Sequence, residues 1–284
     1  MILVTGGTGT SGADIVRELS SRGVKFRALA RNPAKAGDVR LPGVEIVQGD
    51  MSNAKSLEGP LAGVDVALLH SAAASNFVDL QCAFIDAAKK AGVKRIVKFS
   101  ALGADPKSTC RFQQGHAVVE DKLKSSGLTW TMLQPTFFMQ NLLGQADMIK
   151  SGTIYQPAGD GKSAYVDTRD IASVAVVTLT QSGHEGKSYP ITGPADLSFH
   201  DIAATFSKVL GRQIKYVDVP AEAARESLAK MGLPAWNVDG ILELMDLLRS
   251  GKTAGLFRTV KQIAGKVPRT LERFVRDHAS AFNG

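Results

Sequence analysis

The sequence predicts an α/β protein in which a parallel sheet is covered by helices on both faces, that is, a doubly wound sheet. Three observations lead to this fold class. Short apolar runs alternate with amphipathic segments over the first 135 of the 284 residues, a glycine-rich segment directly follows the first apolar run, and no internal repeat interrupts the pattern. Strands and helices that alternate at this spacing form βαβ units with right-handed crossovers.

The first unit of this pattern is the clearest. Ile2–Val4 is a short apolar run that ends in glycines, as a buried parallel strand does. A helix is expected over Ser11–Ser21, with Gly23 as its stop. The strands and helices expected next are Lys25–Ala30, Val44–Gln48 and Val64–Leu69 (strands), Asp79–Ala91 (helix), Arg95–Ser100 (strand), Gln113–Ser125 (helix) and Thr129–Leu133 (strand).

The alternation loosens beyond Pro135, so we expect a core of residues 1–135 and a smaller C-terminal α/β lobe of residues 136–284, intertwined with the core. The lobe is expected to lie over the strand ends, on the substrate side. Its expected elements are helices at Arg169–Gln181, Phe199–Leu210, Ala221–Lys230 and Ala235–Ser250, and strands at Ser188–Ile191 and Ile214–Val217.

Composition excludes several classes of protein. The 44% hydrophobic and 21% charged content is that of an ordinary globular protein. No apolar run approaches the roughly 18 residues of a membrane span, and the N-terminus lacks the basic and apolar stretches of a secretory signal. Cys82 and Cys110 form no CxxC pair, which argues against a zinc site and fits a reducing cytoplasm. We therefore expect a cytoplasmic protein with no metal and no membrane partner.

The net charge of +7 raises the possibility of nucleic-acid binding. The basic residues are spread along the chain, however, and the densest segment, Arg258–Arg276, also contains Glu272. A solvated helix face explains that segment, so no nucleic-acid partner is expected. A mild positive field also favours a phosphorylated cofactor.

The glycine-rich segment Gly6–Gly12 carries the first functional signal. It leaves a strand and opens a helix, which is the context of a dinucleotide phosphate loop. Gly6 allows the tight turn, Gly9 lets the backbone approach a pyrophosphate, and Gly12 lets the helix pack on the sheet. The helix N-terminus offers unpaired N–H groups to the phosphates. The alternative is a turn that merely needs glycine. The context favours a Rossmann-type fold that binds a dinucleotide.

The second strand indicates which dinucleotide. NAD enzymes place an acidic residue at its end, but no Asp or Glu occurs between Lys25 and Gly37. Arg31 stands at that position and Lys35 lies nearby. A guanidinium binds an extra phosphate through two hydrogen bonds, so NADP(H) is expected. The alternative is that Arg31 is a simple loop cation.

Several motifs resemble one known family. The loop has the spacing GxxGxxG, and with it the segments Ala30–Pro33, Gly49–Asp50, Pro135–Asn141 and Val166–Ala172 look like the NmrA-like group of atypical short-chain dehydrogenases. That group includes triphenylmethane dye reductases and quinone reductases. The resemblance places Asp50 beside the adenine; a turn residue or helix cap is the open alternative. The expected cofactor contacts are Gly6, Thr8, Gly9, Thr10, Ser11, Gly12, Arg31, Lys35, Asp50, Met51, Ser71, Ala72, Ala73, Ser100 and His116.

The catalytic pair of typical short-chain dehydrogenases is missing. They use Tyr-x-x-x-Lys, and none of the four tyrosines here has a lysine four residues on. The matching register is Phe112, His116 and Glu120, at helical spacing on one face. Phe112 donates no proton. His116 is the candidate catalytic residue, as a cofactor-ribose ligand or a weak acid that Glu120 pairs with. A capping or core histidine is the alternative.

Aromatic residues suggest the kind of substrate. Phe137, Phe138 and Trp236 are candidate substrate contacts, since aromatic side chains stack on flat molecules; core packing is the alternative for Phe138. We expect an NADPH-dependent reductase that passes hydride to a small aromatic or conjugated electrophile, such as a quinone or cationic dye. The alternative is an NADP(H)-binding regulator without turnover. A monomer or a homodimer is expected.

Overall fold

The computed structural model describes residues 1–283, which form two compact units. The first unit comprises Met1–Ser108, Phe112–Gln134 and Thr168–Pro190, and the second comprises Thr109–Arg111, Pro135–Asp167 and the chain from Ile191 onwards. The expected division at residue 135 differs from these units over Thr109–Arg111, which belong to the second unit, and over Thr168–Pro190. That segment belongs with the first unit because its helix packs on the first helix of the chain.

The doubly wound α/β fold expected from the sequence is confirmed. A seven-stranded sheet has the order β3-β2-β1-β4-β5-β6-β8, and a separate two-stranded sheet pairs β7 with β9. The strands are β1 (Ile2–Val4), β2 (Phe26–Ala30), β3 (Val44–Gln48), β4 (Val66–Leu69), β5 (Arg95–Phe99), β6 (Thr129–Pro135), β7 (Thr153–Gln156), β8 (Lys187–Ile191) and β9 (Lys215–Asp218).

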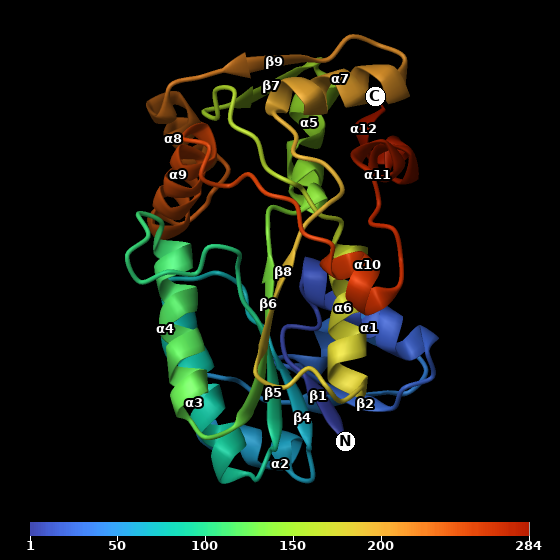
Figure 1. Ribbon diagram of the computed structural model, residues 1–284, viewed down its shortest axis with the longest axis vertical. Coiled ribbons are helices and arrows are strands. Elements are labelled where there is room, and N and C mark those ends of the chain that lie inside the picture. Colours follow the sequence, from blue (N-terminus) through green and yellow to red (C-terminus); the bar gives the residue numbers. More distant parts are fainter. Residues whose placement is uncertain (284) are drawn as a thin grey trace. The chain divides into compact units, whose positions relative to one another are not determined.

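Helices cover the sheet on both faces. In Figure 1, α3 and α4 lie on one side of the sheet of the first unit, and α1 and α6 lie on the other. The α-helices are α1 (Thr10–Ser21), α2 (Glu58–Leu61), α3 (Phe77–Lys90), α4 (Arg111–Ser125), α5 (Ala146–Lys150), α6 (Thr168–Thr180), α7 (Phe199–Leu210), α8 (Ala221–Lys230), α9 (Ala235–Arg249), α10 (Thr259–Ala264), α11 (Leu271–Asp277) and α12 (Ala279–Phe282). Short 3-10 helices are η1 (Pro33–Lys35), η2 (Gly37–Val39), η3 (Ala54–Leu57) and η4 (Met139–Gln145).

The parallel sheet brings the ends of its strands together at one edge. Strands β3, β2, β1, β4, β5 and β6 pair in parallel, with Val4 opposite both Ala28 and Leu68. The segments that follow β1, β4 and β5 therefore lie at the same edge. In such sheets ligands bind beyond the carboxyl ends of the strands.

The apolar pattern explains the packing of the helices. In α1, Ile15, Val16 and Leu19 are fully buried, as their spacing predicts. Almost every residue of α6 is buried, because this helix lies between α1 and the strands β4 and β5. The wholly apolar stretch 174–177 of α6 suits a helix that is buried on several sides.

The second unit has its own core. Its helices and the β7–β9 pair surround a cluster that includes Met139, Ile154, Phe199, Phe206 and Phe274. The sequence analysis expected β9 but missed its partner β7, four residues that no periodic pattern sets apart. None of the helices in residues 1–283 is both long and apolar enough to span a membrane.

Candidate cofactor site

The glycine loop after β1 has the geometry that the sequence predicts. Gly6 has φ +66°, a left-handed conformation that side chains disfavour. A Cβ on Gly6 would also lie 2.8 Å from the His70 carbonyl oxygen, and a Cβ on Gly12 would lie 2.1 Å from the Gly6 carbonyl oxygen. Both positions therefore require glycine for the packing of the protein itself.

Gly9 is different, because the protein gives no steric reason for a glycine there. It is the N-cap of α1 with ordinary extended angles, φ −84° and ψ 168°. Its added Cβ would meet only the Gly6 carbonyl oxygen, at 3.5 Å, and the residue is exposed. The open space at Gly9 lies where a pyrophosphate would approach the backbone.

The start of α1 is built to receive an anion. No side chain caps this helix and its first turn contains no acidic residue. Thr8 and Thr10 are exposed on either side of Gly9. The first backbone N–H groups of a helix have no intrahelical partner and carry a partial positive charge. The loop and the helix terminus together fit the phosphates of a dinucleotide.

The ends of β2 and β3 carry the residues expected near the adenosine. Arg31 and Lys35 are both exposed and free of any ion pair found within residues 1–283. Asp50 accepts hydrogen bonds at Oδ1 from the Ser52 backbone N (2.9 Å) and hydroxyl (2.8 Å). These bonds, together with the charge of Arg31, lower the pKa of Asp50. Met51 is buried in the core of the first unit.

Asp50 therefore has the turn geometry that was its alternative interpretation. The half-buried carboxylate stabilises its own loop through Ser52, and a second role beside the adenine stays a prediction. The cations Arg31 and Lys35 are the groups of this edge that can meet a phosphate.

The segment after β4 is small and open, as expected. Ala72 and Ala73 are exposed, and Ser71 is held by a hydrogen bond from Gln81 Nε2 at 2.7 Å. Ser100, which directly follows β5, is instead fully buried, and its hydroxyl donates to Glu120 Oε1 at 2.7 Å. The Ser100 hydroxyl is thus engaged in a hydrogen bond within the first unit.

His116 lies on α4 but has a different partner from the one expected. Its Nδ1 is 3.0 Å from Lys98 Nζ. The expected pairing with Glu120 is wrong, because that carboxylate is taken up by Ser100, by Gln134 Nε2 at 2.8 Å and by the ammonium of Lys124 at 3.2 Å, as the hydrogen bonds show. His116 is half-buried, and the ring of Phe77 packs against it at a centroid distance of 5.1 Å.

Lys98 was missed by the sequence analysis. It lies in β5 between the apolar neighbours Val97 and Phe99, and its side chain is fully buried. Its Nζ donates to the Phe99 carbonyl oxygen and to His116. Burial lowers the pKa of Lys98 to about 7, although the Glu120 carboxylate partly offsets the effect. A lysine inside a short buried strand is a detectable signal, because buried lysines are rare.

His70 connects the phosphate loop to the end of β4. Its Nε2 is 3.0 Å from the hydroxyl of Ser11, in the first turn of α1, and its ring stacks on Phe99 with centroids 4.2 Å apart. Burial and the charge of Lys98 lower the pKa of His70 to about 3. The same two causes hold the pKa of His116 well below its usual range. Both imidazoles are therefore neutral at pH 7.

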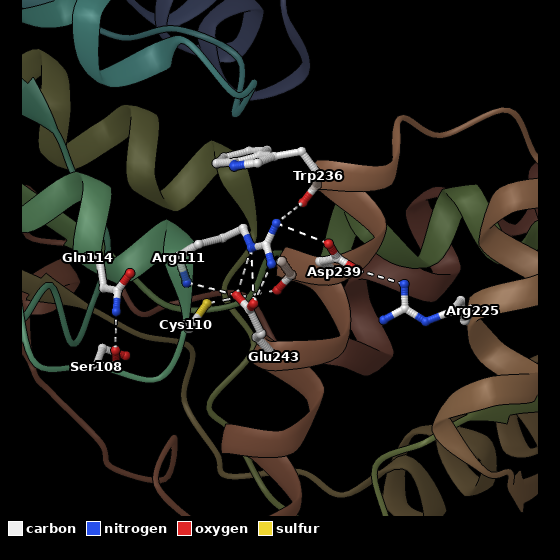
Figure 2. A network of polar contacts seen from close by, with 9 residues as sticks. Ser108, Cys110, Arg111, Gln114, Arg225, Trp236, Asp239 and Glu243 are labelled. Atoms are coloured by element: carbon white, nitrogen blue, oxygen red, sulfur yellow. Dashed lines mark hydrogen bonds and ion pairs between the residues drawn. The ribbon is translucent and has the colours of Figure 1, made fainter.

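The three aromatic candidates all belong to the second unit. Phe137 packs on Tyr165 with ring centroids 5.5 Å apart, and the backbone of Phe138 forms a bridge with Val166. Figure 2 shows that Trp236 lies in a polar network at the start of α9. The guanidinium of Arg111 is 5.8 Å from the centroid of the Trp236 ring.

Arg111 is the centre of that network. Its Nη2 is 2.6 Å from Glu243 Oε1 and its Nη1 is 3.2 Å from Asp239 Oδ2. Asp239 is in turn paired with Arg225 at 2.6 Å (Figure 2). The position of Trp236 is thus fixed by a guanidinium with two carboxylate partners.

Comparison with known proteins agrees with this geometry. The model of the NmrA-like family matches residues 1–275. An NAD(P)H azoreductase from Xenophilus azovorans is 40% identical over 283 residues, which are 99% of each chain. The structure of an NADPH-dependent quinone oxidoreductase from Escherichia coli, solved with NADPH, is 30% identical with a TM-score of 0.89, over 99% of this chain and 100% of the other.

A triphenylmethane reductase from Citrobacter sp., solved with NADP(H), is 25% identical with a TM-score of 0.87, over 98% of this chain and 99% of the other. The match of the family model along nearly the whole sequence, together with a relative of 40% identity, shows that the chain belongs to the NmrA-like family.

Proposed function

We propose that the chain is an NADPH-dependent reductase that passes hydride to a small conjugated electrophile such as a quinone, an azo compound or a cationic dye. The observation that carries the proposal is the glycine loop at α1. Gly6 and Gly12 are required by the fold, whereas Gly9 is left open towards solvent at an uncapped helix N-terminus. That combination is what a bound pyrophosphate needs.

The preference for NADPH over NADH rests on the end of β2. Arg31 and Lys35 are exposed cations, and the Asp50 carboxylate near Arg31 is engaged by Ser52. The extra phosphate of NADPH gains charge-assisted hydrogen bonds from such cations, whereas NADH gains none. The names of the relatives agree, since they include NADPH-dependent and NAD(P)H-dependent reductases.

The choice of acceptor follows from the proton donor. When bound, NADPH supplies two electrons and a proton nucleus as hydride. Reduction of an aliphatic ketone leaves the charge on one oxygen, which needs a strong, well-placed acid. Phe112 supplies none, and His116 is neutral and weakly acidic. Quinones and cationic dyes spread or neutralise the charge, so they tolerate a weaker donor.

The second unit is proposed to supply the contacts for a flat acceptor. Phe137 and Trp236 are half-buried aromatic side chains, and Trp236 is held in place by Arg111. Phe138 is proposed as a further contact, and its backbone bridge to Val166 also gives it a packing role.

The test is NADPH oxidation over a panel of acceptors at fixed pH: a quinone, an azo dye, a cationic triarylmethane dye and an aliphatic ketone. Steady turnover with at least one conjugated acceptor, and little with the ketone, is expected. Tight NADPH binding without turnover on any acceptor would instead identify an NADP(H)-binding regulator.

A further inference from the structure

Lys98 is a buried cation that has no carboxylate hydrogen-bonded to its Nζ among the described residues. Its side chain is fully buried in the central strand β5, and its two hydrogen-bond acceptors in residues 1–283 are the Phe99 carbonyl and His116 Nδ1. Burial of an unpaired ammonium costs several kcal/mol. An apolar residue such as methionine would fill this place in the core without that cost. The lysine therefore calls for a functional explanation.

The geometry fixes the direction of the Lys98–His116 hydrogen bond. An ammonium has only donors, so Nδ1 of His116 must accept at 3.0 Å. The proton of the neutral ring is then on Nε2, the opposite nitrogen. No partner for Nε2 is found among the described residues, and His116 is half-buried on α4 beside the ring of Phe77. The ring nitrogen opposite Lys98 therefore carries an N–H group, with the ammonium on the other side of the ring.

We propose that Lys98 positions His116 and stores a proton for the reductase. Lys98 passes this proton to His116 when His116 protonates the reduced acceptor. The proposal rests on the proposed reductase function. His116 is the group that meets the acceptor, and Lys98 acts through it.

The proton step balances for a quinone. The quinone accepts hydride, and the His116 Nε2–H bond breaks as an O–H bond forms on the reduced acceptor. At the same time a Lys98 N–H bond breaks and a proton binds Nδ1, so the imidazole stays neutral. A proton from the solvent then binds Nε2, and the Nδ1 proton returns to Lys98. The sum is quinone, NADPH and one proton converted to hydroquinone and NADP⁺.

The surroundings of Lys98 suit this role. The titratable groups that face it are Cys82 on α3, His116 and Glu120 on α4, and His70 after β4. Burial brings the pKa of Lys98 to about 7, so the ammonium can give up a proton near neutral pH. Burial, and second to it the charge of Lys98, lowers the pKa of both histidines, so a single exchangeable charge resides in the cluster.

Two acceptors separate this role from a structural one. A cationic triarylmethane dye becomes neutral on accepting hydride and needs no proton, whereas a quinone needs one. Loss of Lys98 as the proton store should therefore lower kcat more for the quinone than for the dye. A residue that merely held the cofactor or the fold would affect both equally.

The experiment compares Lys98→Met with the parent protein on both acceptors. Because a general acid typically contributes about 100-fold or more, we expect the ratio of quinone to dye kcat to fall at least about tenfold. In the parent, quinone kcat should decline as the pH rises through about 7, where the ammonium is lost, and this limb should be absent in Lys98→Met and with the dye. Lys122→Met removes a half-exposed lysine of α4 that pairs with Asp86; it is the matched control and should match the parent.

A readout without turnover completes the test. The ¹⁵N shifts of His116 in the parent without cofactor should report the Nε2–H tautomer, and Lys98→Met should change the tautomer population. If Lys98→Met fails to fold, His116→Gln, which cannot relay a proton, should give the same fall in the quinone-to-dye ratio.

Equal losses with both acceptors, an unchanged ratio, or an Nδ1–H tautomer in the parent would each overturn the proposal. No turnover of either acceptor by the parent would overturn the reductase function itself. That failure is distinguishable, because the tautomer measurement then still shows whether Lys98 and His116 form the pair.

Discussion

Substitution of Gly9 separates the needs of the cofactor from the needs of the fold. A Cβ at this position would have one neighbour within 4 Å, the Gly6 carbonyl oxygen at 3.5 Å, which is ordinary van der Waals contact. The backbone angles of Gly9 are open to any residue. Gly9→Ala removes chain entropy from the unfolded state, worth about 0.4 to 1 kcal/mol, and weakens the N-cap by a similar amount. The stability without cofactor should therefore change by less than about 1 kcal/mol.

Binding of NADPH should respond very differently. The new methyl group occupies the space where the pyrophosphate approaches the helix terminus, so one or more phosphate hydrogen bonds lengthen or break. Each charge-assisted bond contributes about 1.5 to 3 kcal/mol, so the affinity should fall by roughly tenfold to more than 100-fold. The larger Gly9→Val should abolish measurable binding while the fold survives.

The assay pairs thermal unfolding without cofactor with a fluorescence titration of NADPH. Gly12→Ala is the contrasting variant, because its Cβ would lie 2.1 Å from the Gly6 carbonyl oxygen. Overpacking of that kind costs about 1 to 3 kcal/mol, so this variant should lose both stability and affinity. Gly37→Ala, whose Cβ would meet nothing within 4 Å, should lose neither. An affinity of Gly9→Val within about twofold of the parent would refute the reasoning and leave the loop a purely structural turn.

Further predictions address the cofactor phosphate, the acceptor and the pH dependence of stability. Arg31→Ala should weaken NADPH binding about tenfold and leave NADH binding unchanged; equal losses for both nucleotides in a titration would contradict the assigned phosphate contact. Turnover of an aliphatic ketone should be at least about 100-fold slower than that of a quinone or cationic dye; comparable kcat values would show a stronger proton donor than His116. His70 has a pKa of about 3 in the folded protein and 6.5 as its ordinary value, so the unfolded chain binds the extra proton between these pH values. Stability should fall as the pH is lowered through this window, by at most about 1.4 kcal/mol per pH unit from this residue, and His70→Asn should flatten that slope in thermal unfolding; an unchanged slope would show that His70 is not a buried neutral imidazole.

The glycine loop could be predicted from the sequence because its constraints are local. Gly6 and Gly12 are needed by a turn and a helix that are contiguous in the chain, and their strand and helix are marked by short-range patterns. The same holds for the strands and helices that the sequence predicts in the first unit, whose ends agree with the expected ones to within about two residues. The four-residue helix α2 was not predicted.

The partners of the catalytic candidate could not be predicted in the same way. The spacing of Phe112, His116 and Glu120 correctly puts them on one helix, but spacing within α4 does not reveal which side chain of the neighbouring strand faces each of them. The register of β5 against α4 places Lys98 at His116 and Ser100 at Glu120. Such pairings depend on tertiary packing. The one sign of them in the sequence is a lysine inside the short apolar strand β5.

The second unit was less predictable because its elements are short. The β7 strand has four residues and pairs with β9 some sixty residues later, a contact that no local pattern encodes. The chain also leaves this unit at Thr168 and returns at Ile191, because α6 packs on α1. A single boundary at residue 135 therefore does not separate the two units.

The most direct measurement of the central claim follows hydride itself. The protein is incubated with NADPH that carries deuterium at nicotinamide C4, prepared as each stereoisomer in turn, and with a cationic triarylmethane dye. The leuco dye is then analysed by mass spectrometry. We predict that one deuterium appears in the leuco dye from one stereoisomer and none from the other. Saturable NADPH binding without deuterium in any product would contradict the assignment of this chain as a reductase.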